Sequence, residues 1–290
     1  MRIKLIAVVV GALSEGILAA ASAQSLDIYL EQAFAERRVE ERQAIRHIGI
    51  QGQQIEKGFL VSAVLESYPA HRAGLRRGDV ITQAEGADFD PIESFDSDTD
   101  SQVQSSYLLQ VNRGEQELEL SVSPIEENLY NSFRNATLNS VLEFSRGNKV
   151  IGYVRLWGLS RNTADLLSYT QIIEGLDHCD GIILDLRDSY GYEDPSLRSL
   201  FIPESLASDA YRKPVAILVN GQTRKGGESL TAALDHLERI ISIGEPTAGE
   251  SDALDYTAHE PEYSLSFPTT ESRRDDPQFE TAVDILMGII

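Results

Sequence analysis

The chain has 290 residues, with 25 basic and 46 acidic side chains and a formal net charge of −21 at pH 7. Such an acidic balance excludes a surface that follows nucleic-acid phosphates, so we expect no nucleic-acid partner. The single cysteine, Cys179, excludes an intrachain disulfide. Because it directly precedes an apolar strand pattern, we interpret it as a small buried hydrophobic residue.

Residues 1–23 have the pattern of a cleaved export signal: basic residues, an apolar run and then Ala21-Ser22-Ala23. Cleavage there would leave 23 basic and 45 acidic residues. No later run approaches the roughly 20 apolar residues that a membrane helix needs. The sequence therefore predicts an exported protein, periplasmic or secreted, without a membrane span.

Residues 24–47 are expected to form one amphipathic helix. Leu26, Leu30 and Phe34 recur at helical spacing among charged residues, and the segment contains no proline or glycine. Its apolar stripe is expected to pack on the rest of the chain.

Residues 48–125 change to short alternating β runs with turn residues between them. One phrase, YPAHRAGLRRGDVI at Tyr68–Ile81, closely matches the recurring signature of PDZ domains, which this segment resembles. The resemblance implies that an extended peptide adds to a sheet edge while a backbone nest receives its terminal carboxylate. Ile48, Gly49 and Ile50 are the residues expected to form that nest. The polar stretch Ser94–Gln102 stands where a groove-lining helix would be expected.

Residues 126–148 read as a helical connector, and residues 149–290 as alternating strands and helices. Continuous apolar strands separated by amphipathic helices predict an α/β layer around a largely parallel, buried sheet. The predicted fold class is thus multidomain α/β and α+β, with an N-terminal helix, a PDZ-like domain and a larger α/β domain.

The phrases IGYVRL, GIILDLRDSYGY, KPVAILVNG, GGESLTAAL and IGEPTAGE follow the PDZ-like segment in that order. Together they resemble the C-terminal-processing, or tail-specific, serine peptidases over nearly all of residues 45–290. The resemblance implies a crotonase-like catalytic core. It also implies a serine at a helix start, activated by a lysine and assisted by an oxyanion hole of backbone N–H groups.

Carried onto this sequence, the family motifs show a degenerate dyad. The family turn reads GSASASE before an apolar helix, and Glu228 fixes the register, so the nucleophile position holds Lys225. The position of the lysine base holds Glu250. The loop expected to supply oxyanion donors keeps Gly191, and Gly226 follows the nucleophile position. Ser189 and Tyr192 depart from the family's loop. A semi-buried ion pair between Lys225 and Glu250 is expected.

The sequence thus predicts a pseudo-peptidase that binds protein C-terminal tails without cleaving them, with an active homologue as a further candidate partner. The alternative is an active serine endopeptidase with a shifted nucleophile, Ser229, one helical turn from Lys225. A purely structural role, or processing by residues outside the recognised motifs, also stays open. No cofactor is expected. No metal site is expected either, because none of the histidines is closely paired: His47, His71, His178, His236 and His259.

Overall fold

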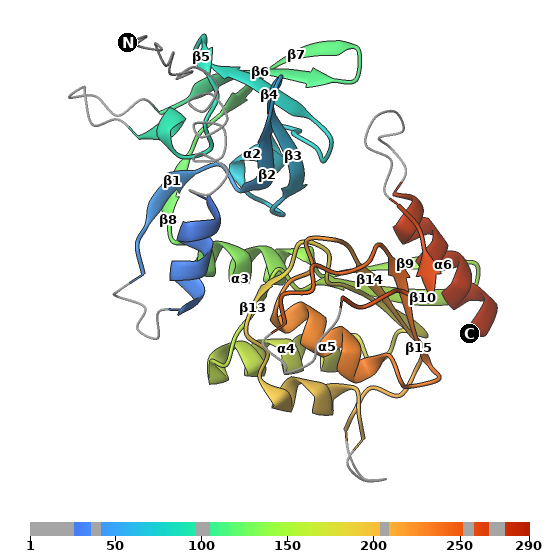
Figure 1. The fold of residues 1–290 in the computed structure, drawn as a ribbon. Coiled ribbons are helices and arrows are strands. Elements are labelled where there is room, and N and C mark those ends of the chain that lie inside the picture. The colour runs from blue at the N-terminus through green and yellow to red at the C-terminus, as the bar shows by residue number, and fades with distance from the viewer. Residues whose placement is uncertain (1–25, 36–41, 97–104, 204–208, 252–257, 267–275) are drawn as a thin grey trace, which may run out of the picture.

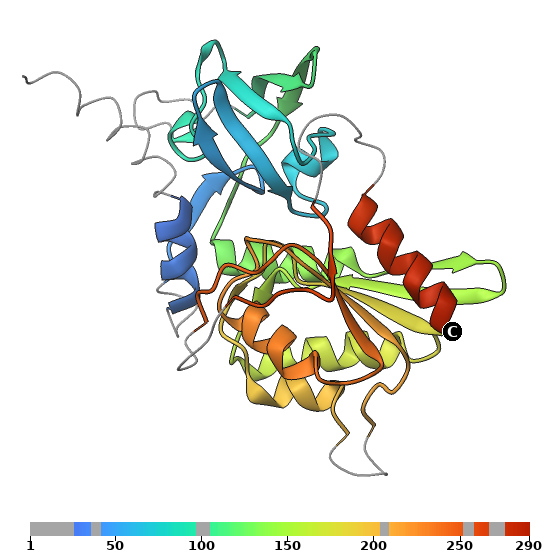
Figure 2. The same ribbon diagram turned by 45° about the vertical axis from the view of Figure 1, so that its right-hand side comes forward.

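The computed structural model describes the chain except for residues 1–25, 36–41, 97–104, 204–208, 252–257 and 267–275. The predicted export signal lies outside the described residues. Within them, no helix is both long and apolar enough to span a bilayer. A β-rich domain stands above a larger α/β domain (Figures 1 and 2), which confirms the predicted fold class.

The N-terminal helix is shorter than predicted. Residues 26–35 are helical, but Ile45–His47 form strand β1 instead of the end of a helix reaching residue 47. β1 pairs antiparallel with β8, Ile125–Glu127. The prediction failed here because the spacing of apolar residues is local, whereas β1 is a strand only through its pairing with β8, which begins 80 residues after Ile45.

The PDZ domain is built on one antiparallel sheet in the order β2-β3-β4-β6-β7, with β5 beside β4. Its elements are β2 Ile50–Ile55, β3 Gly58–Val64, α2 Pro69–Arg72, β4 Val80–Ala84, β5 Ala87–Asp88, the 3-10 turn Glu93–Phe95, β6 Tyr107–Arg113 and β7 Gln116–Val122. The sheet order ends at β2, so β2 is an edge strand. Residues 97–102 of the predicted polar insertion lie outside the described residues.

The segment predicted as a helical connector is only partly helical. Helix α3 spans Leu129–Ser140, with the Asn128 side chain accepting from the Asn131 N–H at its start. Strand β8 precedes α3, and strand β9, Leu142–Arg146, follows it. β9 pairs antiparallel with β10. Residues 142–146 therefore belong to the sheet of the second domain.

The second domain carries a six-stranded sheet in the order β16-β15-β14-β12-β10-β9, parallel except for β9. Its elements are β10 Lys149–Arg155, β11 Gly158–Leu159, α4 Thr163–Gly175, β12 Gly181–Asp185, β13 Tyr190–Gly191, the 3-10 helix Pro195–Leu200, β14 Val215–Val219, α5 Gly226–Leu234, β15 Ile240–Gly244, β16 Tyr263–Ser264 and α6 Pro277–Ile289.

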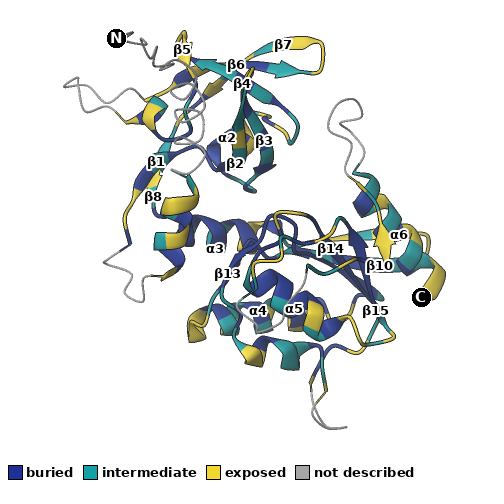
Figure 3. Ribbon diagram, viewed as in Figure 1, coloured by how far each residue is buried: buried dark blue, intermediate teal, exposed yellow. Residues whose placement is uncertain are grey.

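Helices cover both faces of this sheet, so its central strands β12, β14 and β15 are buried throughout and mostly apolar (Figure 3). Alternate strand residues, such as Leu184 and Ile217, pack with α4 and α5. Their neighbours, such as Ile183 and Leu218, pack with α6.

A separate apolar cluster joins the three parts of the chain. It combines the N-terminal helix (Leu30, Phe34), the PDZ domain (Ala63, Leu65, Tyr68), α3 (Tyr130, Phe133) and the second domain (Trp157, Tyr190). Burial of these side chains fixes the PDZ domain over the ends of strands β12 and β14, where the candidate site lies.

Candidate functional site

The turn between β14 and α5 is held rigidly against the neighbouring strand. The Asn220 N–H donates to Thr223 Oγ1 at 3.0 Å, and Thr223 Oγ1 donates to the Leu186 carbonyl at 2.9 Å. Both polar side chains are buried. The turn therefore presents the start of α5 in one fixed position.

Lys225 occupies the N-cap of α5, where the sequence placed the nucleophile. Its φ of 49° and ψ of −107° lie in a region that residues other than glycine rarely adopt. Its ammonium lies 5.8 Å and 5.7 Å from the ring centroids of Tyr190 and Tyr192. The backbone keeps a strained elbow at this position, while the side chain makes cation–π contacts.

The expected ion pair between Lys225 and Glu250 is wrong. Both residues lie within the described chain, and no salt bridge joins them; Glu250 is exposed. Its main chain is anchored by Glu228, whose buried carboxylate accepts N–H groups from Lys225 at 3.1 Å, Gly249 at 2.5 Å and Glu250 at 2.8 Å. Glu228 thus ties the helix start to the following turn and leaves the Glu250 side chain in solvent.

Ser229 is engaged with neighbours that are not bases. Its hydroxyl bonds the Lys225 carbonyl at 3.2 Å, one turn back, and lies 2.9 Å from the Ser251 hydroxyl. Back-bonding to a carbonyl is the usual behaviour of serine inside a helix. Nothing in this arrangement activates Ser229 as a nucleophile.

Gly191 and Gly226 let the loop of residues 189–193 pack closely on the start of α5. A Cβ on Gly226 would lie 2.9 Å from the Gly191 carbonyl oxygen, and one on Gly191, at φ +113°, would lie 2.1 Å from that of Leu159. The Gly226 N–H is among the first of α5, which lack intrahelical partners. These candidate oxyanion residues are therefore brought together, beside Lys225.

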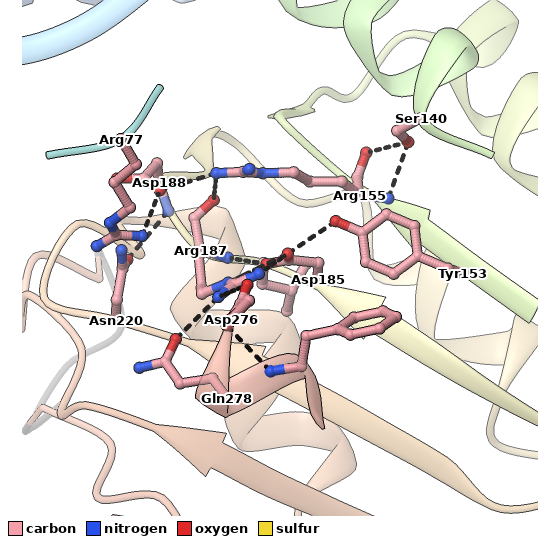
Figure 4. A network of polar contacts seen from close by, with 12 residues as sticks. Arg77, Ser140, Tyr153, Arg155, Asp185, Arg187, Asp188, Asn220, Asp276 and Gln278 are labelled. Carbon is pink, nitrogen blue, oxygen red and sulfur yellow. Dashed lines mark hydrogen bonds and ion pairs between the residues drawn. The ribbon is translucent and has the colours of Figure 1, made fainter. Parts of the chain in front are cut away.

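The Asp-Leu-Arg motif forms a buried ion pair under this loop (Figure 4). Arg187 donates to Asp185 through Nε at 2.9 Å, and to Gln278 through Nη1 at 3.0 Å. Burial opposes ionisation of the Asp185 carboxyl, but the guanidinium groups of Arg187 and Arg155 outweigh it and lower its pKa to about 2. This motif is structural here, and its distant partner Gln278 was not recognised from the sequence.

Asp188 links the loop to the PDZ domain. Its buried carboxylate lies 2.8 Å from Arg155 Nη2 and 3.7 Å from Nη1 of Arg77, which comes from the PDZ domain (Figure 4). Its carbonyl accepts from Gln51 Nε2 on β2 at 3.4 Å. The edge strand of the PDZ domain is thus in contact with the loop beside Lys225.

The residues predicted to form the carboxylate nest lie at the entry to β2 and are buried. The Gly49 N–H, at φ +78°, donates to His47 Nδ1 at 3.1 Å. Because Nδ1 accepts this hydrogen bond, the neutral ring carries its proton on Nε2. Nε2 lies 3.1 Å from the Ser132 hydroxyl. Burial lowers the pKa of His47 to about 4. The Gly49 donor is therefore satisfied internally in this structure, which the sequence did not reveal.

A cavity of about 240 Å³ lies between β2 and the turn of residues 220–227. Leu30, Ile50, Leu129 and Phe133 supply apolar walls, and Arg224 lies in its polar part. Arg224 Nη2 is 3.1 Å from Asp27 of the N-terminal helix. The cavity thus combines residues from every part of the chain, and sequence spacing alone could not assemble it.

Comparisons with known proteins agree with this architecture. Residues 47–123 match the family model of the PDZ domain. Over 225 residues, 67% of this chain and 42% of the relative, the sequence is 25% identical to carboxyl-terminal-processing peptidase 2, chloroplastic, of Arabidopsis thaliana. The chain thus spans about two fifths of the length of that curated relative.

Among solved structures, a putative S41 protease from Bacteroides fragilis shares the fold with a TM-score of 0.59 at 15% identity, covering 86% of this chain and 84% of that chain. A photosystem II D1 C-terminal processing protease has a TM-score of 0.48 at 17% identity, covering 89% and 85%. The PDZ match, the Arabidopsis relative and the fold shared with the Bacteroides fragilis protein confirm the resemblance predicted from the motifs.

Proposed function

We propose that this PDZ-containing relative of the C-terminal-processing peptidases binds protein C-terminal tails along the free edge of β2 and does not hydrolyse them. The observation that carries the proposal is the cavity between β2 and the turn of residues 220–227, with Lys225 at the nucleophile position. An edge strand beside an apolar cavity suits an added peptide strand, because the backbone pairs with β2 and side chains enter the cavity.

The nest supports weak rather than tight capture of a carboxylate. Because the Gly49 N–H already donates to His47, a peptide carboxylate must replace that hydrogen bond. Exchanging one hydrogen bond for another brings only a modest net gain. We therefore assign most of the affinity to strand pairing and to apolar contacts with residues such as Ile50.

The binding proposal is tested with one peptide in two forms, with a free and an amidated C-terminus, by calorimetry on the purified chain. The free form should bind more tightly, because the amide removes the charge that backbone donors receive. Ile50→Ser, at the cavity wall, should weaken both forms. Leu108→Ser, at an exposed position of β6, is the matched control and should leave binding unchanged. Equal affinities of the two peptide forms would contradict the proposal that the chain binds a terminal carboxylate.

The absence of hydrolysis rests on the chemistry of Lys225 and Ser229. A charged ammonium forms no acyl ester, and the Ser229 hydroxyl is bonded to a carbonyl and another hydroxyl. A fluorophosphonate probe should therefore leave the chain unlabelled. Labelling that disappears in Ser229→Ala would support the alternative, an active serine endopeptidase with a shifted nucleophile.

Restoring a serine and a lysine at the two dyad positions tests whether other residues also prevent peptidase activity. We expect Lys225→Ser with Glu250→Lys to give at most weak peptidase activity, since Ser189 and Tyr192 also depart from the family's loop. Robust cleavage by the double variant would contradict this view of the loop.

We further propose that the chain acts after export, in the periplasm or outside the cell, where it meets protein tails alone or beside an active homologue. N-terminal sequencing of the exported protein tests this proposal. A mature chain beginning near Gln24 supports export with cleavage, and an uncleaved chain in the cytoplasm contradicts it.

A further inference from the structure

Three potential metal ligands meet at the open edge of the second domain's sheet, far along the chain from the degenerate dyad. His178 Nε2 lies 2.9 Å from Glu143 Oε2 and 3.9 Å from Cys179 Sγ. All three ligand atoms lie within 4.8 Å of one another. We propose that Glu143, His178 and Cys179 bind one divalent transition-metal ion of the zinc class, with water completing the coordination.

The sheet register brings these residues together. Glu143 on the edge strand β9 lies directly opposite Gly152 of β10. A Cβ on Gly152 would come within 3.2 Å of Cys179 Sγ, so the missing side chain gives the sulfur its place beside the strand. His178 precedes Cys179 in the turn between α4 and β12. The tertiary pairing of β9 therefore supplies a ligand 35 residues away from the histidine.

The hydrogen bonding of His178 orients Nε2 toward Glu143, as a shared metal ion would require. Its Nδ1 lies 3.0 Å from the Gly175 carbonyl, which only accepts, so Nδ1 carries a proton. In a neutral ring Nε2 then has a lone pair, yet it faces a carboxylate oxygen at 2.9 Å, which also only accepts. A metal ion bound by both atoms would take the place of the proton that this contact otherwise needs. A backbone carbonyl that fixes Nδ1 is the usual partner of a metal-bound histidine.

The distances suit a zinc-sized ion after small side-chain movements. With bonds of about 2.0 Å to nitrogen and oxygen and about 2.3 Å to sulfur, tetrahedral ligands stand about 3.3 Å (N to O) and about 3.6 Å (N to S) apart. The observed values of 2.9 Å and 3.9 Å are close to these. The Glu143 and His178 side chains are 44% and 57% exposed, so both can adjust.

The donor set selects among metals. A thiolate and an imidazole favour Zn²⁺ and its neighbours over Mg²⁺ and Ca²⁺, which prefer oxygen ligands. Three protein ligands leave one position open to water. Burial raises the pKa of the Cys179 thiol, so the ion must displace its proton on binding. The ion would fasten the edge strand β9 to the turn before β12.

The test is a Co²⁺ titration of the purified chain, freed of any histidine tag. Cys179 is the only cysteine, so a thiolate-to-cobalt charge-transfer band can report this residue alone. We expect one equivalent of Co²⁺ to give that band with tetrahedral visible bands, and Zn²⁺ to displace it. Zn²⁺ should also raise the thermal midpoint, because it binds the folded chain.

Variants assign the ligands. Cys179→Ser should abolish the band. His178→Gln and Glu143→Gln should each lower affinity by at least about 10-fold, a loss that even second-shell changes cause. His236→Gln, at an exposed position away from the cluster, should bind like the parent. Absence of the band, or unchanged affinity in a folded His178→Gln, would overturn the proposal. Because His178 is exposed, that variant decides the matter even if Cys179→Ser does not fold.

Discussion

The Lys225 ammonium lies 5.7 Å from the ring centroid of Tyr192, so two departures from the peptidase motifs are in contact with each other. The first is a lysine where the resemblance implies a serine nucleophile, and the second is an aromatic ring where the resemblance implies a glycine of the loop Asp-Leu-Arg-x-Asn-x-Gly-Gly. Their contact gives a structural reason for a lysine at a position with a φ of 49°: the cation–π contact partly offsets the backbone strain.

Replacing Lys225 by glycine should therefore stabilise the fold. A strained residue of this kind costs about 1–3 kcal/mol, whereas an exposed cation–π contact contributes about 0.5–1 kcal/mol. We expect Lys225→Gly to raise the free energy of unfolding by about 1 kcal/mol in urea titrations. Lys225→Ala, which keeps the strain and loses the ammonium, should be no more stable than the parent. A glycine variant less stable than the alanine variant would contradict the strain.

Removing the charge of Asp188 should destabilise the second domain, since its closest cationic partner, Arg155, lies on β10 of the same domain. Its carboxylate is fully buried against Arg155 at 2.8 Å, and a buried pair that loses one partner typically costs about 3–5 kcal/mol. We expect Asp188→Asn to cost about 3 kcal/mol in chemical unfolding. Arg77→Gln is the control, since the Arg77 side chain is 26% exposed and 3.7 Å away, and it should cost about 0–1 kcal/mol. Equal costs would show that the buried pair is not the dominant contact.

Glu228 should prove more important to stability than either dyad position. Its carboxylate accepts three main-chain N–H groups, and a glutamine must turn its amide toward at least one of them. We expect Glu228→Gln to lower the free energy of unfolding by about 2–3 kcal/mol. Glu250→Gln, at the exposed neighbouring site, should stay within about 0.5 kcal/mol of the parent. A neutral Glu228→Gln would refute this anchoring role.

The free energy of unfolding should decrease as the pH is lowered, because His47 is buried in its neutral form. Its pKa is about 4 in the folded chain against 6.5 for a free histidine, so the unfolded chain binds the extra proton first. The contribution is fully present above about pH 6.5 and is lost as the pH falls toward 4. With about 1.4 kcal/mol for each pKa unit, the loss reaches about 3 kcal/mol. Urea titrations at pH 7 and pH 4.5 measure it.

His47→Gln serves as the control for that pH dependence. It removes the titrating group, so the loss between pH 7 and pH 4.5 should shrink relative to the parent, whatever the variant's stability at pH 7. An unchanged pH slope would show that other groups cause the loss.

The sequence by itself determined the order of the domains and the register of the dyad. The signature at Tyr68–Ile81 and the apolar strands after residue 149 are local patterns, in which each residue's neighbours settle whether it faces a core. The same local register placed Lys225 at the start of α5, and the structure agrees. Such local patterns predict the elements correctly because burial of the periodic apolar residues is the main driving force for folding each element.

Only the tertiary structure decided which side chains meet. Lys225 contacts tyrosines instead of Glu250, because Glu228 holds the main chain of the second turn. Gly49 gives its N–H to His47, and Glu143 reaches His178 only because β9 joins the sheet edge. Spacing along the chain encodes which face of an element is buried. The partner of a polar group depends on the packing of distant elements, where differences of a few ångströms decide each contact.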